Sequence, residues 1–278
     1  MTDEIPTHLA TVARAAQVTP GVRRVTFTGS DLGTFASISP DQFVHLLLPP
    51  PGRDELTVDR DFTWVGHYLM PDEDKPVGAY YTVRHHRPEQ CELDLDFVLH
   101  HDPGPASAFA LRAAPGDPVA LWGPRTAFTP ADDVDWYLLV ADETGLPATA
   151  AILEDLHGRF DGPVVVLVEV AGPEEHQPLA VGPNVEVTWL HRGDRPAGTT
   201  TQLVDAVRAL DLPGGRPYVW GGAESRAMTG IRRHLRRGVG YARDDVSLTP
   251  YWRHAAHPEE PDEDEEADGR VEAAAVER

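Results

Sequence analysis

The pattern of apolar residues changes once along this chain, near residues 128–133, and this change limits the fold more than any other feature. Before it, short runs of β-branched and aromatic residues alternate with turns such as Pro20-Gly21 and Pro115-Gly116, as is typical of antiparallel sheets. The runs predict strands over Val12–Val18, Val22–Thr28, Phe43–Leu48, Tyr80–Arg84, Glu92–Leu99 and Val119–Trp122. Six strands with one short helix predict a closed antiparallel barrel, and the Pro- and Asp-rich segment 49–78 is expected to be a long loop over its mouth.

After the change, buried strands and helices alternate. Trp136–Ala141 and Val164–Val170 are continuous apolar runs, which is typical of strands covered on both faces. Further strands are expected over Val185–Leu190 and Tyr218–Trp220, and helices over Leu146–His157, Thr200–Leu210 and Ser225–Arg237. This alternation predicts a parallel sheet with a ligand crevice at the carboxyl ends of its strands. We therefore expect an α+β protein of two domains: an N-terminal antiparallel Greek-key β-barrel and a C-terminal α/β parallel-sheet domain.

The predicted domain boundaries follow from this change and from the distribution of charge. We expect a barrel domain over residues 1–128, an α/β domain over 129–256 and an acidic tail over 257–278. The tail has ten acidic residues and two Arg, a net charge of −8, which leaves −13 on the rest of the chain. Because it lacks apolar periodicity, it is expected to be disordered and to aid solubility.

Composition and charge exclude several classes of protein. A net charge of −21 argues against a nucleic-acid binder. The single cysteine, Cys91, allows no intramolecular disulfide and cannot hold an iron–sulfur cluster, which needs about four thiolates. The N-terminus has no secretory signal pattern and no apolar run approaches the ~20 residues of a membrane span, so a cytoplasmic protein is expected.

Two motifs in the first half carry groups suited to an aromatic, anionic ligand. Tyr81-Thr-Val-Arg84 closes a predicted strand with an aromatic ring, a hydroxyl and a guanidinium. Gly104-Pro-Ala-Ser107 opens an apolar run, where free backbone N–H groups and the helix dipole favour an anion. Each motif alone is more often ordinary packing, but together they supply what a flavin dinucleotide needs.

In their order along the chain, these and further motifs resemble the siderophore-interacting protein family, a branch of the ferredoxin-reductase-like flavoproteins. The matching segments are Tyr81–Arg84, Asp96–His100, Gly104–Ser107, Phe109–Ala110, Pro115–Asp117, Gly123–Arg125, Ala141–Ala148, Trp220–Glu224, Arg232–Leu235 and Tyr251–Arg253. The resemblance extends from about Val12 to Arg253. It implies that the second domain is of the nucleotide-binding type.

The resemblance also implies the cofactors and the residues that hold them. FAD is expected with its ring against Tyr81, its N5 region near Thr82, and its pyrophosphate between Arg84 and the helix start at Gly104. The implied flavin-binding residues are Tyr81, Thr82, Val83, Arg84, His100, Gly104, Pro105, Ala106 and Ser107. NAD(P)H is the implied electron donor, contacting Asp142, Glu143, Thr144 and Glu224 in the second domain. Ala79 stands where the family usually has an Arg, so Arg84 and the helix start must carry the pyrophosphate.

The implied substrate is a ferric siderophore, held by local cations. By resemblance these positions are His45, Arg125, Arg253 and His254. His45 replaces a Lys of the family, and we expect it to gain charge as pH falls toward 6, which would strengthen siderophore binding.

The implied activity is reduction of iron(III) in the siderophore to release iron(II). Such a reductase needs no acid–base triad, because the flavin performs the redox chemistry, so no catalytic side chain is assigned. The scattered histidines predict no metal site. Two alternatives stay open: another NAD(P)H–flavin electron-transfer oxidoreductase, and a non-enzymatic siderophore-binding protein. Ferredoxin is an alternative electron donor.

Overall fold

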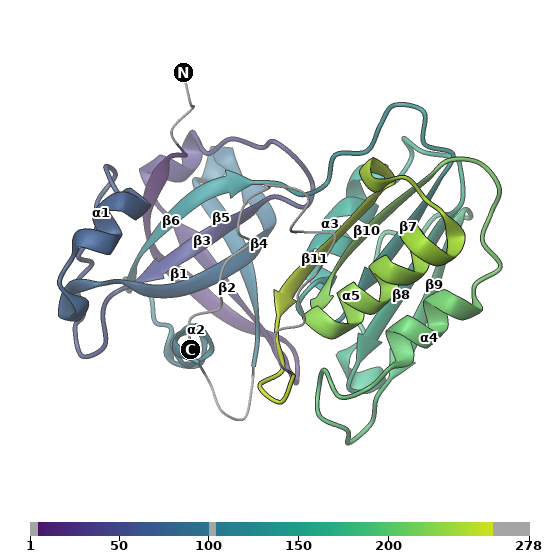
Figure 1. Cartoon of the computed structure of the whole chain (residues 1–278). Helices are drawn as coiled ribbons and strands as arrows, with labels where there is room; N and C mark the ends of the chain where they lie inside the picture. The colour runs from purple at the N-terminus through teal and green to yellow at the C-terminus, as the bar shows by residue number, and fades with distance from the viewer. Residues whose placement is uncertain (1–4, 100–103, 258–278) are drawn as a thin grey trace. The chain divides into compact units, whose positions relative to one another are not determined.

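The computed structural model describes residues 5–99 and 104–257. His100 and most of the predicted acidic tail, residues 258–278, lie outside the described residues. The chain divides into two compact units that meet between Thr126 and Ala127 (Figure 1). Each unit is described by itself.

The first unit is a closed antiparallel barrel. Its strands are β1 (Thr7–Thr19), β2 (Val22–Thr28), β3 (Phe43–Leu48), β4 (Val77–Arg87), β5 (Glu92–Val98) and β6 (Pro118–Arg125). They pair in the order β1-β2-β5-β4-β3-β6, and β6 closes the barrel by pairing with β1. Because β5 lies beside β2, and β6 lies between β3 and β1, the connections cross as in a Greek key. The predicted barrel is confirmed.

Alternation along the barrel strands sends every second side chain to the interior. On β3, Val44, Leu46 and Leu48 join the central core, whereas Phe43, His45 and Leu47 do not. Helix α2 (Pro105–Arg112) adds Ala106, Phe109 and Ala110 to the same core, where the ring centroid of Phe109 lies 6.5 Å from that of Phe27.

Segment 49–78, which we expected to be a long loop, contains a short helix and packs on the outside of the barrel. Helix α1 (Trp64–Leu69) begins after Thr63, whose hydroxyl accepts a hydrogen bond from Gly66 N. Phe62 is buried with Leu47 and Ala120, with Trp64 and Trp122 packed beside them. The rest of the segment is mainly loop, as expected. Its aromatic residues nevertheless cover an apolar surface of the barrel, which the Asp- and Pro-rich composition did not predict.

The second unit is a five-stranded parallel sheet with helices on both faces (Figure 1). The strands are β7 (Trp136–Ala141), β8 (Val164–Val170), β9 (Val185–His191), β10 (Pro217–Glu224) and β11 (Val246–Trp252), in the order β11-β10-β7-β8-β9. Helix α3 (Leu146–Leu156) packs on one face, and α4 (Gln202–Ala209) and α5 (Ser225–Arg233) pack on the other. The predicted parallel-sheet architecture is confirmed. Because both faces are covered, β7 is buried along its whole length.

The sequence prediction missed β11 and shortened β10. The segment that forms β11 contains Pro250, which argues against a strand, but β11 lies at the edge of the sheet, where proline is tolerated. The strand was predicted to end before the Gly221-Gly222 pair, but β10 continues through it. Helix α5 ends at Arg233 rather than Arg237, and a π-helical turn over His234–Val239 follows it.

Short 3-10 helices complete the described structure, over Ser30–Gly33, Asp72–Asp74, Pro88–Gln90, Pro173–Glu175 and Arg243–Asp245. In the described ranges 5–99 and 104–257, no helix has both the length and the apolar character that crossing a membrane requires.

Candidate functional site

Strand β4 changes its partner in the middle of the Tyr81–Arg84 motif. Through Thr82 it pairs with β3, and from Val83 onward it pairs with β5. Val83 opposes Leu95 and His85 opposes Asp94, so Arg84 is the extra residue of a β-bulge. Bulges re-aim side chains and often lie beside binding sites. The Arg84 side chain is buried, with 8% of the residue exposed.

Tyr81 and Thr82 point to opposite sides of β4. The Tyr81 ring lies 4.4 Å from the ring of Phe97 and packs against the barrel core, and burial raises the pKa of its hydroxyl. Thr82 is 6% exposed, and its Oγ1 has no hydrogen-bond partner among the described residues. An unpaired buried hydroxyl is unfavourable unless a ligand or water completes it. Thr82 is therefore a place where the protein alone leaves a polar group unsatisfied.

Helix α2 is anchored beside this strand. Gly104 is its N-terminal cap and Pro105 its first residue, and no side chain among the described residues caps the first turn. Ser107 Oγ donates a 2.9 Å hydrogen bond to the carbonyl of Val98, which ties the helix start to the end of β5. The first N–H groups of a helix have no intrahelical acceptor. The backbone N–H groups of Ala106 and Ser107 therefore suit an anion.

A row of aromatic side chains with one cation lies on β3, β4 and β6. The guanidinium carbon of Arg125 lies 5.6–5.8 Å from the ring centroids of Phe43, Tyr80 and Trp122, and its Nη1 is 3.3 Å from the Tyr80 hydroxyl. The His45 ring contacts Tyr80 and Trp64, at centroid distances of 4.6 and 4.9 Å. The alternating pattern of β3 could have indicated this row, but the sequence analysis selected only His45 and Arg125 from it.

The environment of His45 overturns the expected pH response. Burial lowers the pKa of His45 to about 4, and the nearby His67 lowers it further in the same direction. Its Nδ1 is buried without a hydrogen-bond partner among the described residues. His45 is therefore neutral near pH 6, and the prediction that it gains charge there is wrong, because the rings around it exclude water.

At the carboxyl edge of the parallel sheet, the carboxylate of Asp142 joins three strands. Its Oδ1 accepts from Thr144 N and Oγ1, and its Oδ2 accepts from Glu224 N at 3.0 Å and from Trp252 Nε1 at 2.7 Å. Burial raises the pKa of Asp142, although these hydrogen bonds oppose the shift. Since the residue follows β7 and its partners lie on β10 and β11, Asp142 holds these strand ends together.

Two further carboxylates at this edge are also paired. Glu143 Oε1 accepts from Ala171 N at 3.0 Å and from Arg192 Nη1. Burial, and secondly the neighbouring Asp142, raise the pKa of Glu143 to about 7, against the opposing effect of Arg192. Glu169 accepts from the Thr200 hydroxyl. Arg192 and Glu169 were not predicted from sequence, because their roles depend on the loops after β8 and β9.

Glu224 caps helix α5 and anchors the segment after β11. Its carboxylate accepts from Arg226 N at 2.7 Å, from His254 N at 3.2 Å and from His257 Nδ1 at 3.0 Å. Burial alone would raise the pKa of Glu224, but these hydrogen bonds outweigh it and lower the pKa. The backbone of His254 is therefore fixed at this edge, and the exposed Arg253 lies beside it in the chain.

The turn over Asp142–Leu146, where NAD(P)H contacts were expected, is closed by hydrogen bonds among its own residues. The N–H groups of Thr144, Gly145 and Leu146 all donate to Asp142. A Cβ on Gly145 would lie 2.0 Å from Gly222 O, so this glycine permits contact between the turn and β10 rather than with a ligand. The structure brings Asp142, Glu143, Thr144 and Glu224 together, but as an internally hydrogen-bonded cluster.

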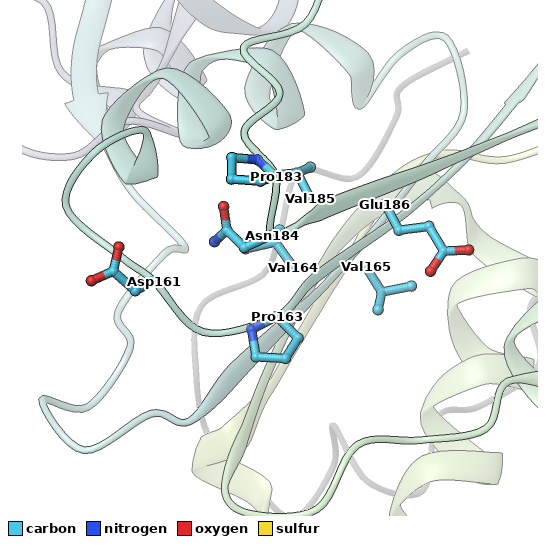
Figure 2. A pocket seen from close by; sticks show the side chains of 8 residues that line it. All are labelled: Asp161, Pro163, Val164, Val165, Pro183, Asn184, Val185 and Glu186. Carbon is cyan, nitrogen blue, oxygen red and sulfur yellow. The ribbon is translucent and has the colours of Figure 1, made fainter.

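A surface hollow lies at the other end of the same sheet (Figure 2). It is lined by Asp161, Pro163, Val164, Val165, Pro183, Asn184, Val185 and Glu186, and Val164 and Val185 are the first residues of β8 and β9. Asn184 Nδ2 donates to the carbonyls of Phe160 and Gly162, so its amide is used to join two loops. Ligands of open α/β sheets bind at the carboxyl ends of the strands, so this hollow is not the expected nucleotide site.

Comparison with known proteins covers both units. Residues 11–128 match the family model described as siderophore-interacting FAD-binding domain, and residues 134–255 match that of the siderophore-interacting protein. Ferric vibriobactin reductase ViuB of Vibrio cholerae is 29% identical over 255 residues, covering 91% of each chain. The NADPH-dependent ferric-chelate reductase of Escherichia coli is 29% identical over 249 residues, covering 87% of this chain and 91% of that one. The crystal structure of the siderophore-interacting protein SipS from Aeromonas hydrophila has a TM-score of 0.76 at 31% identity, covering 91% of this chain and 94% of that one.

Proposed function

Since the chain belongs to the siderophore-interacting protein family, we propose that it is an FAD-dependent reductase of ferric siderophores that takes its electrons from NAD(P)H. The observation that carries the proposal is the buried Thr82 hydroxyl, which has no partner in the described part of the chain and lies beside the Arg84 bulge, within a domain of the FAD-binding type. Two relatives named as ferric reductases, of Vibrio cholerae and Escherichia coli, support the choice of reaction.

The residues of the barrel fit a flavin dinucleotide. The Thr82 hydroxyl, which has no partner among the described residues, can hydrogen-bond to a ligand. Tyr81 offers an aromatic ring, and Arg84 offers a buried cation. The start of α2, from Gly104 through Ser107, has no side-chain cap and leaves N–H groups for a pyrophosphate. We assign Tyr81, Thr82, Val83 and Arg84 to flavin binding, together with Gly104, Pro105, Ala106 and Ser107. His100 is kept in this assignment from the sequence, as it lies outside the described residues.

When bound, FAD would supply the redox chemistry, between a two-electron hydride donor and one-electron reduction of iron(III). The hydroxyl of Thr82 would donate a hydrogen bond to the ring, and Tyr81 would keep water from one side of it. Arg84 and the α2 start neutralise phosphate charge, which the strongly acidic chain would otherwise repel. The two electrons of each hydride suffice for two iron(III) ions.

For the electron donor we propose the edge formed by Asp142, Glu143, Thr144 and Glu224. Because the N–H groups of Thr144, Gly145 and Leu146 are already paired, contact with NAD(P)H must rely on side chains and on other backbone groups. Stopped-flow mixing of the FAD-loaded protein with NADH and with NADPH tests this proposal. Loss of flavin absorbance with either donor is expected. No loss with both would point to a protein donor such as ferredoxin.

For the iron substrate we propose contacts with His45, Arg125, Arg253 and His254. With His45 neutral, Arg125 is the cation of the aromatic row on the barrel, where three rings fix its position. Ferric complexes with aromatic chelating groups can stack on such rings and meet the guanidinium at their edge. Arg125→Ala should therefore weaken binding more than His45→Gln, as measured by titrating a ferric siderophore into each variant.

The decisive experiment follows iron(II) directly. The purified chain is loaded with FAD and given NADPH, a ferric siderophore and a coloured iron(II) chelator without oxygen. Colour should develop in proportion to enzyme, and Arg84→Ala should slow it at limiting FAD, whereas Arg112→Ala, an exposed Arg at the end of α2, should not. Oxidation of NADPH without formation of iron(II) would refute siderophore reduction and leave only a flavin reductase.

A further inference from the structure

Helix α5 and the π-helical turn after it carry a concentration of positive charge that the proposed function does not use. Residues 225–240 contain five Arg and no acidic residue, in a chain whose net charge is −21. Arg226, Arg233 and Arg237 are exposed and Arg236 is half-buried. We call these four residues the arginine face.

The arginine face is opposite to the side of the helix that packs on the sheet. Met228, Ile231 and Leu235 are fully buried in the core with β7 and β10. Arg226 and Arg233 are seven residues apart, which places them on one side of the helix, turned away from those residues. Arg232 is different, since it is buried and donates to the carbonyl of Leu248. Arg226 and Arg233 therefore lie outside the core that α5 forms with the sheet.

The described structure ends next to the start of this helix. His257 is the last described residue, and its Nδ1 lies 3.0 Å from Glu224 Oε1. Glu224 is the N-terminal cap of α5 and accepts hydrogen bonds from Arg226 N and Ala227 N. The segment that follows, residues 258–278, thus starts beside the N-terminal end of α5, the helix that carries the arginine face.

Charge and length both suit an interaction between this segment and the helix. Residues 258–278 contain ten acidic residues, five of them in the run Asp262-Glu-Asp-Glu-Glu266. From Ser225 to Val239 the helix is at most about 22 Å long at 1.5 Å per residue. Ten residues of chain can span ~33 Å, so the acidic run can reach every member of the arginine face. A tethered segment also acts at a high effective concentration.

We propose that the acidic segment 258–278 binds the arginine face of its own chain. The interaction is electrostatic: several exposed carboxylate–guanidinium pairs, each weak alone, add up because the segment is tethered. It keeps the arginine face from other polyanions, and it weakens as salt shortens the screening length.

Retention on immobilised heparin, a polyanion, tests the proposal in the full-length protein at an ionic strength of about 0.05 M. The wild type should flow through, because its own segment covers the arginine face. The tail-neutral variant, which combines Asp262→Asn, Glu263→Gln, Asp264→Asn, Glu265→Gln and Glu266→Gln, should be retained. These substitutions lie outside the described residues. Urea unfolding of the tail-neutral variant and the wild type, with equal results expected, checks that the variant is folded.

A matched pair of variants shows where the heparin binds. Adding Arg226→Gln, Arg233→Gln and Arg236→Gln to the tail-neutral variant should abolish retention. Adding Arg159→Gln, Arg195→Gln and Arg208→Gln changes the net charge equally at exposed sites elsewhere, and it should leave retention unchanged. The proposal is overturned if the tail-neutral variant elutes with the wild type, or if both sets of substitutions abolish retention alike.

Tryptic cleavage after Arg270 gives a second readout. Release of residues 271–278, followed by mass spectrometry, should be several-fold faster in the variant that carries only Arg226→Gln, Arg233→Gln and Arg236→Gln than in the wild type. The difference should vanish at about 0.5 M salt, where charges are screened. Equal release rates at low salt would contradict the proposal.

Discussion

In strand β4 of the barrel and at the carboxyl edge of the parallel sheet, polar groups are hydrogen-bonded in opposite ways. On β4, the Thr82 hydroxyl is buried without a partner among the described residues. At the sheet edge, Asp142 and Glu224 each accept several hydrogen bonds from their own unit. Both places match motifs of the same family, yet only the first leaves a polar group for a ligand to complete. The hydrogen bonds at the sheet edge hold strand ends together, so the NAD(P)H contacts proposed there must use other groups of that edge.

The largest expected effect comes from removing the carboxylate at the closed edge. Asp142→Ala leaves the Glu224 N–H and the Trp252 indole N–H buried without an acceptor, so it should lower the free energy of unfolding by about 3–5 kcal/mol. Urea unfolding of the two proteins measures this difference. Asp211→Ala, at an exposed position of the same unit, is the control and should change stability by less than about 0.5 kcal/mol. A similarly small effect of Asp142→Ala would mean that the edge is open rather than closed.

The sequence predicted the barrel, the parallel sheet and the family, and the comparisons confirm all three. These features depend on local patterns: alternation in strands such as β3, continuous apolar runs such as β7, and motifs in fixed order. The hydrogen bonds at the carboxyl edge of the parallel sheet could not be predicted from such local patterns. Trp252 meets Asp142 only because β11, a strand that contains Pro250, joins the sheet. Glu224 meets Asp142 because β10 continues past Gly221-Gly222 to that edge. The lowered pKa of His45 likewise depends on burial and, secondly, on His67. His67, and Trp64 whose ring contacts His45, belong to a segment that was predicted to be a loop.

The next largest effect concerns FAD affinity at the barrel site proposed around Thr82 and Arg84. Arg84→Ala should weaken FAD binding by on the order of 1.5–3 kcal/mol, roughly 10- to 150-fold, because one charge-assisted contact with the pyrophosphate is lost. Fluorescence titration of FAD into the flavin-free protein measures the affinity. Arg112→Ala removes the same charge from an exposed position in the same unit and should leave the affinity unchanged. Equal affinities of all three proteins would remove Arg84 from the flavin site.

A smaller effect concerns the sheet edge, where the free energy of unfolding should depend on pH through Glu143. The pKa of Glu143 is about 7 in the folded protein and 4.5 in its ordinary state, so the folded protein holds this proton more tightly. The resulting stabilisation is full below the unfolded pKa and is lost as pH rises through about 7.

Glu143→Gln should therefore remove on the order of 1–2 kcal/mol of the loss in stability between about pH 5 and pH 8, since the amide does not titrate. Urea unfolding at a series of pH values measures it, and Glu186→Gln, exposed on β9, serves as the control. An unchanged pH profile in Glu143→Gln would mean that the ion pair with Arg192 keeps Glu143 charged throughout.

The smallest effect tests the comparison most directly, because its two readouts should have opposite signs. Thr82→Val keeps the shape of the side chain and replaces the unpaired hydroxyl by a methyl group. The flavin-free protein should become slightly more stable, by up to about 1 kcal/mol, since an unsatisfied buried group is removed. FAD affinity should fall by about 1 kcal/mol, roughly fivefold, since the flavin loses a hydrogen bond. Thr82→Ser keeps the hydroxyl and should retain most of the affinity. If Thr82→Val instead lowered stability and left FAD binding unchanged, the hydroxyl would have a partner within the protein, and the barrel site would be as closed as the sheet edge.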